Sequence, residues 1–218
     1  MSLLPVLAPH SPVALAYGRL GDVRDLTPSL CAIESAKAIG VMNKENPRKA
    51  ARVIAGWLST REAVWWAALC QSQLMEIPGI QPETKILKAV IEWVRQPGEA
   101  TRAPFNNQQM KPASVSLGHL VAAVTLTRDS LSPVEKSPVP CPAGLAHRMV
   151  ALSVLAAADE WPEPGQAACL AHFLELGLDV SDCKLPWQET AIEKHPGLRH
   201  DTNPIKGRKK LGNIWENW

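Results

Sequence analysis

The fold of this chain is decided by residues 59–69, STREAVWWAAL. Ser59 and Glu62 have the spacing of a capping box, in which each side chain accepts a hydrogen bond from the backbone N–H of the other residue. The helix that follows is apolar on every side, and Trp65 and Trp66 point about 100° apart around its axis. Side chains at that angle cannot both face one neighbour. We therefore expect a buried central helix that is enclosed by other helices.

A second helix is predicted immediately before this one. Asn46 is suited to the N-cap position, and Pro47 is suited to the first helical position. The apolar residues that follow lie on one stripe of a helix: Ala50, Val53, Ile54, Trp57 and Leu58. Because the connection to the capping box is so short, we expect the two helices to form an antiparallel or sharply angled pair.

Further helical patterns extend along most of the chain. They cover residues 28–39, 82–96, 114–128, 143–159 and 164–176, with a weaker pattern at 98–110. Gly40 and Gly177 are predicted to end the first and last of these helices, since glycine favours the backbone conformation that closes a helix. No segment alternates as a strand does. The predicted fold class is all-α, an irregular bundle of about six to eight helices with an extended C-terminal tail. The core is expected to include Trp57, Trp65, Trp66 and Trp93.

The sequence divides into three segments. Residues 1–27, which include Pro5, Pro9 and Pro12, are expected to be irregular, and residues 28–183 are expected to form the helical domain. Residues 184–218 are expected to form a basic tail that carries tryptophans. Within the domain, residues 129–142 (DSLSPVEKSPVPCP) contain four prolines and are predicted to be a linker or a long surface loop.

The composition is that of an ordinary globular protein. Of the 218 residues, 46% are apolar and 20% are charged, and the net charge of +2 gives no general attraction to nucleic acid or anionic lipid. The five cysteines are scattered and form no CxxC pair, so we expect free thiols in a reducing compartment. The N-terminus lacks the basic start of a signal peptide, and no apolar run is long enough to span a bilayer. We therefore expect a cytoplasmic protein with no membrane insertion.

No catalytic, cofactor-binding or metal site is predicted. The sequence has no phosphate-binding loop and no nucleophile elbow. His195 and His200 are five residues apart, with Cys183 upstream, which is not the spacing of a helical ligand pair. His147 and His172 are interpreted as histidines with satisfied hydrogen bonds at the edge of the core. Residues 159–163, with three acids, are interpreted as a solvated acidic turn.

The tail contains the candidate partner-binding residues. They are Trp187, Lys206, Arg208, Lys209, Lys210, Trp215 and Trp218. Tryptophans are favoured anchors at protein interfaces, so the tail either docks on a partner protein or folds back on its own domain. The basic run also allows a nucleic-acid interaction, with phosphates held by the lysines and bases stacked on tryptophan, although one short run is a weak signal.

Residues 61–67, REAVWWA, resemble the signature of a bacterial family of helical proteins of unknown function. The WV pair at residues 93–94 and the FLELGLD stretch at 173–179 are similar to further features of that family. The resemblance covers about residues 28–182 and departs from the family pattern at 117–142 and in the tail. It implies a gene neighbourhood of type VI secretion and an accessory role, with no recognised catalytic residues.

The sequence is compatible with three functions. The leading hypothesis is a non-enzymatic cytoplasmic interaction protein, an adaptor or chaperone for secretion machinery or its cargo. The alternative is a nucleic-acid-binding module that uses the basic tail. The third is an enzyme whose site is assembled from residues far apart in the sequence.

Overall fold

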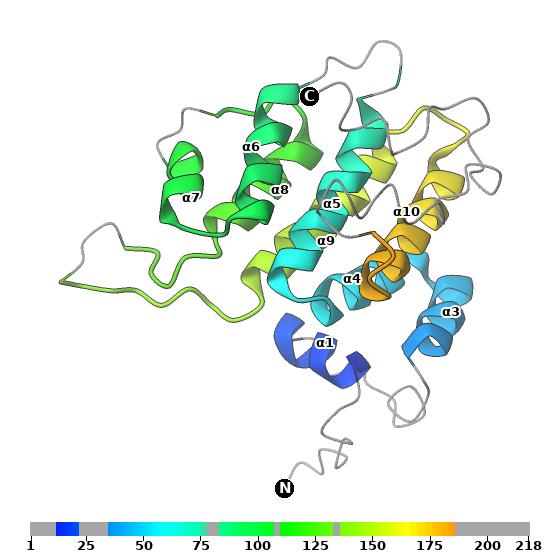
Figure 1. Cartoon of the computed structure of the whole chain (residues 1–218). Helices are drawn as coiled ribbons and strands as arrows, with labels where there is room; N and C mark the ends of the chain where they lie inside the picture. Colours follow the sequence, from blue (N-terminus) through cyan, green and yellow to red (C-terminus); the bar gives the residue numbers. More distant parts are fainter. Residues whose placement is uncertain are drawn as a thin grey trace, which may run out of the picture.

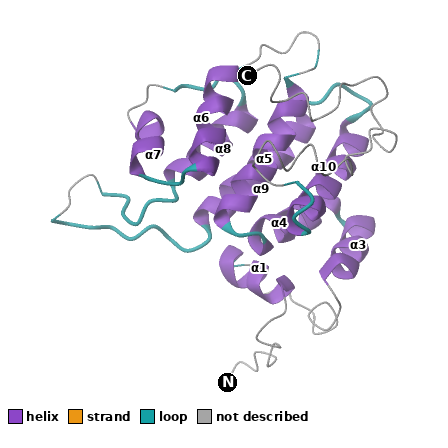
Figure 2. Ribbon diagram, in the orientation of Figure 1, coloured by secondary structure: helices purple, strands orange, loops and turns teal. Residues whose placement is uncertain are grey.

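The computed structural model describes residues 12–21, 35–75, 77, 83–106, 110–132 and 136–185. This part of the chain is all-α, as predicted, and contains nine helices and no strand (Figure 2). The helices are α1 (Pro12–Leu20), α3 (Ser35–Glu45), α4 (Pro47–Trp57), α5 (Thr60–Leu74), α6 (Thr84–Arg95), α7 (Glu99–Asn106), α8 (Val115–Thr125), α9 (Leu145–Asp159) and α10 (Gln166–Ser181).

Helix α5 is the central helix of the bundle (Figure 1). Every residue from Ala63 to Leu74 is buried, because α4, α6, α8, α9 and α10 all contact this helix. The predicted capping box is present. The Ser59 N–H donates to Glu62 Oε2 at 2.9 Å, and the Glu62 N–H donates to Ser59 Oγ at 3.4 Å. The local sequence therefore starts the helix, and burial on all sides keeps it in place.

The two adjacent tryptophans of α5 face different neighbours. Trp65 Nε1 donates to the carbonyl of Leu185, and Trp66 Nε1 donates to the carbonyl of Phe173, each at 2.7 Å. Their exposed fractions are 1% and 0%. Trp93 of α6 is buried as well, whereas Trp57 at the end of α4 is only partly buried and packs against the core from its edge.

The two glycines that were predicted to end helices lie inside helices. Helix α3 continues past Gly40 to Glu45, and α10 continues past Gly177 to Ser181. Gly177 is buried where α10 approaches α4 and α5. A Cβ atom there would lie 2.7 Å from Ile54 Cγ2 and 2.9 Å from Trp66 Cε2. The reason for this glycine is close helix packing, which its sequence neighbours do not reveal.

The prediction that residues 1–27 are irregular is wrong for residues 12–20, which form α1. Pro12 occupies the first position of the helix, where proline is tolerated. Arg19 Nη1 donates to the carbonyls of Gly56, Trp57 and Leu58 at 2.8–3.2 Å, which are unpaired acceptors at the end of α4. Arg148 of α9 donates to the Leu20 carbonyl. These tertiary hydrogen bonds hold α1 on α4 and α9.

The acidic turn after α9 is more than a solvated turn. The Glu160 carboxylate accepts hydrogen bonds from the Ser116 N–H at 2.9 Å and from Ser116 Oγ at 2.6 Å, and so caps the start of α8. Asp159 pairs with Arg48 of α4 at 2.8 Å on the exposed surface. The carboxylates of this turn therefore connect α9 to α8 and α4. No helix within the described ranges has both the length and the apolar character needed to cross a bilayer.

Candidate functional site

An open groove of about 420 Å³ lies where the ends of several helices meet. We call it the Trp93 groove. Its walls come from the start of α5, the end of α6, α7, the end of α8 and the loop that leads into α9. The residues that line it are Thr60, Arg61, Trp93, Pro97, Arg102, Leu126, Thr127 and residues 141–147.

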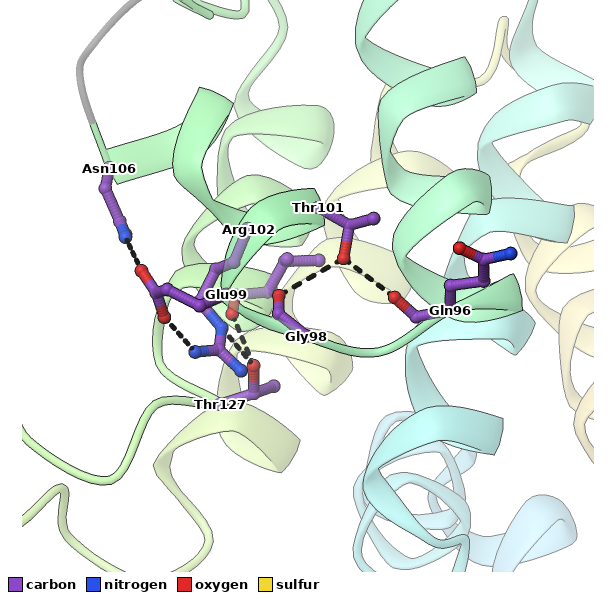
Figure 3. Close-up of polar contacts among 8 residues, drawn as sticks. Gln96, Gly98, Glu99, Thr101, Arg102, Asn106 and Thr127 are labelled. Carbon is purple, nitrogen blue, oxygen red and sulfur yellow. Dashed lines mark hydrogen bonds and ion pairs between the residues drawn. The ribbon is translucent and has the colours of Figure 1, made fainter.

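Arg102 is held on one wall by a polar network that joins α7 to the end of α8 (Figure 3). Its Nε donates to Thr127 Oγ1 at 3.1 Å, and its Nη1 donates to Glu99 Oε2 at 2.7 Å. Asn106 Nδ2 holds the other oxygen of Glu99 at 3.1 Å. The Arg102 side chain is only 13% exposed, whereas that of Glu99 is 68% exposed. The guanidinium is therefore fixed at the groove, and its carboxylate partner lies toward solvent.

Arg61 supplies a second guanidinium and connects two helices. Its Nε donates to the carbonyl of Val94, and its Nη2 donates to the carbonyl of Arg95 at 2.8 Å. These carbonyls belong to the last turn of α6, where they have no partner within the helix. Burial lowers the pKa of Arg61, but the group stays charged at any pH that proteins tolerate.

The loop before α9 folds back to form the opposite wall. The Leu131 N–H donates to the Val139 carbonyl at 2.7 Å, and Cys141 Sγ donates to the Leu126 carbonyl at 3.1 Å. This loop therefore is anchored to the end of α8, and it extends from the helices in Figure 1. Gly144 follows with a φ of +75°, and a Cβ atom there would lie 1.6 Å from the Arg19 carbonyl oxygen. Only glycine fits this position.

Gly144 is the N-cap residue of α9 and offers no side chain to the helix. No side chain of the described residues caps this helix start. The first N–H groups of a helix have no partner within the helix and carry its positive dipole end. The amides of Ala146 and His147 belong to that first turn, and both residues line the Trp93 groove.

Two buried polar side chains of the groove lack hydrogen-bond partners within the described part of the chain. Trp93 is 3% exposed, and its indole Nε1 has no acceptor. His147 is 7% exposed, and neither ring nitrogen has a partner with acceptable geometry, so it is not the satisfied histidine that the sequence predicted. Burial lowers the pKa of His147, the charge of Arg19 lowers it further, and the nearby Leu58 carbonyl opposes both effects.

The lining is one-sided in charge. It contains two guanidinium groups, and none of its described residues is Asp or Glu. The Trp93 indole N–H, the Thr60 hydroxyl and a helix start add further hydrogen-bond donors beside the apolar surfaces of Pro97, Leu126 and Pro142. This arrangement is suited to a ligand that brings a hydrogen-bond acceptor with negative charge, next to an apolar part.

Residues 40–181 match the model of a family described as Family of unknown function (DUF6931). The chain belongs to this family. The DUF6931 match includes every residue that lines the Trp93 groove, whereas α1 lies before it. No curated protein and no solved structure shows a significant match to the chain.

The predicted partner-binding residues of the tail lie outside the described residues. They are Trp187, Lys206, Arg208, Lys209, Lys210, Trp215 and Trp218. His195 and His200 lie outside as well, and Cys183 is exposed. Among the residues that the structure describes, no three His, Cys, Asp or Glu side chains are grouped closely enough to hold a metal ion.

The sequence patterns did not predict Arg61, Arg102, Thr127 and Gly144 as residues of a groove. They are spread over more than eighty positions, so no spacing rule relates them. Arg61 lies in the REAVWWA stretch, and Trp93 was assigned to the core alone. An arginine just inside the start of a predicted helix is the only local signal, because such a residue is poorly placed for its own helix dipole.

Proposed function

We propose that this chain is a non-enzymatic, cytoplasmic interaction protein, an adaptor or chaperone that binds a segment of a partner protein in the Trp93 groove. The observation that carries the proposal is Trp93, which lines an open groove and whose buried indole N–H has no acceptor among the described residues. An unpaired buried donor costs about 1–3 kcal/mol. A bound ligand that supplies the acceptor would recover that free energy.

The shape and lining of the groove favour a protein segment. The groove is open to the surface, and apolar residues from three elements lie beside its donors. Protein interfaces combine a buried apolar centre with hydrogen bonds around it. Tryptophan and arginine are enriched among their strongest contacts. An extended segment would lie along the groove and place one acceptor at Trp93.

The family resemblance of residues 61–67 supports the choice of partner. It implies a gene neighbourhood of type VI secretion, so components of that machinery and its cargo are the first candidates. This part of the proposal depends on the resemblance, whereas binding in the groove depends on the geometry. The two parts are separate and can be tested separately.

The test uses the full chain, tagged and purified from its native host, with a matched pair of variants. Ala143→Trp places an indole on an exposed position of the groove wall, and Val139→Trp places one on an exposed position of the same loop that does not line the groove. We expect a partner that binds the wild-type chain and Val139→Trp but is lost with Ala143→Trp, both in the host and with purified proteins. A partner that binds all three chains equally would contradict the proposal.

Nucleic-acid binding through the basic tail is the alternative, and it rests on residues outside the described ranges. It predicts binding to a single-stranded oligonucleotide that weakens steeply with salt and is lost when residues 184–218 are removed. Ala143→Trp should leave such binding unchanged. The same variant therefore separates the two functions.

A further inference from the structure

We infer that the segment bound in the Trp93 groove presents a carboxylate, which is received between Trp93, Arg102 and the start of α9. This inference rests on the proposed function and names the chemistry that the groove selects. The carboxylate belongs to an aspartate or glutamate side chain of the partner or to the partner's C-terminus. Nothing in the family description assigns a ligand to this groove.

Trp93 determines which kind of atom the ligand must bring to the groove. An indole N–H can only donate, so the atom that completes it must be an acceptor. A carboxylate accepts through both oxygens, and hydrogen bonds to an ionised acceptor are about twice as strong as neutral ones. One oxygen can therefore pair with Trp93 while the other pairs with a second donor of the groove.

The charge of the groove favours an acidic ligand. Arg102 brings a guanidinium on a side chain that is 13% exposed, and its partner Glu99 is not part of the lining. Glu99 binds one amino group of Arg102 and is itself 68% exposed. It therefore already shows that this guanidinium pairs with a carboxylate, and it competes for Arg102 with any acid that enters the groove.

The start of α9, a helix of 15 residues, also favours an anion. Gly144 at its N-cap leaves the amides of Ala146 and His147 without a side-chain cap, and both residues line the groove. Helix starts of this kind bind anions. A singly charged carboxylate suits the groove better than a phosphate, because Glu99 already neutralises part of the charge on Arg102.

The experiment screens immobilised random decapeptides with free C-termini against the fluorescently labelled full chain, in the presence of wild-type or Ala143→Trp competitor. A peptide is groove-dependent if the labelled chain is displaced from it by the wild-type competitor but not by the Ala143→Trp competitor. The strongest of these is resynthesised with its Asp and Glu replaced by Asn and Gln, with an amidated C-terminus, and with phosphoserine in place of the acidic residue. Affinities are then measured by titration calorimetry against the wild-type chain and the variants Trp93→Phe, Arg102→Gln and Glu99→Gln, each first shown to melt cooperatively.

We expect removal of the carboxylate, or Arg102→Gln, to weaken binding about ten-fold or more, and Trp93→Phe to weaken it about five-fold. Glu99→Gln should tighten binding, because it removes the competing acid. The ¹H–¹⁵N resonance of the Trp93 indole, assigned with Trp93→Phe, should shift on binding, which a purely structural role would not produce. If affinity is lost when Asp and Glu are replaced by Asn and Gln, the carboxylate is that of a side chain. If affinity is lost when the C-terminus is amidated, the carboxylate is that of the C-terminus.

Other outcomes contradict the inference in distinguishable ways. Groove-dependent peptides that bind equally well without their carboxylates overturn the inference and leave the proposed function standing. A phosphoserine peptide that binds more tightly than its acidic counterpart overturns the assignment of the carboxylate. If the screen recovers no groove-dependent peptide, the proposed function fails, and the inference fails with it.

Discussion

The indole N–H of Trp66 donates to the backbone carbonyl of Phe173, 2.7 Å away, and so joins the central helix α5 to α10. Gly177 lies one helical turn after Phe173, and its missing side chain leaves room for the same indole ring. The three residues form one contact: Trp66 supplies the donor, Phe173 supplies the acceptor, and Gly177 supplies the space for the ring. The two helices that meet here are more than a hundred residues apart in the sequence. Its parts can be tested one at a time.

Replacing Trp66 measures the value of this contact. Trp66→Phe removes the N–H and part of the ring, and should lower the free energy of unfolding by about 1–3 kcal/mol. Trp66→Ala and Trp65→Ala should each lower it by about 3–5 kcal/mol, because both side chains are buried. Urea titration followed by far-UV circular dichroism gives these values. If both alanine variants unfold like the wild-type chain, α5 is not the centre of the core.

Replacing the two glycines that lie inside helices with alanine should change the free energy of unfolding in opposite directions. Gly177→Ala brings a methyl group to within 2.7 Å of Ile54 and 2.9 Å of Trp66, so we expect a loss of about 1–3 kcal/mol in the free energy of unfolding. Gly40→Ala is the matched control, since nothing lies within 4 Å of its position in α3. It should gain about 0.5–1 kcal/mol from helix propensity. Equal melting temperatures for the two variants would show that Gly177 is not tightly packed.

Glu160 should contribute more to the stability of the fold than Glu163, which lies in the same turn. Glu160→Ala removes the acceptor of the Ser116 N–H and the closer of the two acceptors of the Ser116 hydroxyl, and should cost about 1–3 kcal/mol. Glu163 is exposed, so Glu163→Ala should change stability by no more than about 0.5 kcal/mol. Chemical denaturation at pH 7 compares the two. Similar small effects in both variants would mean that the turn is only a solvated acidic cluster.

His147 should make the fold sensitive to mild acid. Its pKa is lowered in the folded chain, mainly by burial, so the unfolded chain binds the proton more tightly. Stability from this residue is therefore complete above about pH 6.5 and falls as the pH drops toward the folded pKa. Between pH 7.5 and 5.5 the wild-type chain should therefore lose more stability than His147→Gln. If the two chains show the same dependence on pH, the buried histidine is not the sensitive group.

Local chemistry was enough to predict the elements whose signals lie within a few residues. The Asn46 cap, the Ser59–Glu62 box and the position of α5 depend on side chains that reach backbone groups three residues away, so the sequence contains the whole interaction. The apolar stripe of α4 and the all-round apolar surface of α5 likewise follow from residue spacing alone.

The tertiary structure decided the rest. The sequence predicts the same role for Gly177 and Gly40, yet only Gly177 packs against a tryptophan. Helix α1 is held by hydrogen bonds of Arg19 and Arg148 to partners more than thirty residues away in the sequence. The Trp93 groove combines side chains from five elements, none of which signals a site alone. Capping and amphipathicity depend on residues close together in the sequence, so they can be predicted from it. Which donor meets which acceptor, which charges pair and where a side chain must be small depend on which helix surfaces come together in the packed fold.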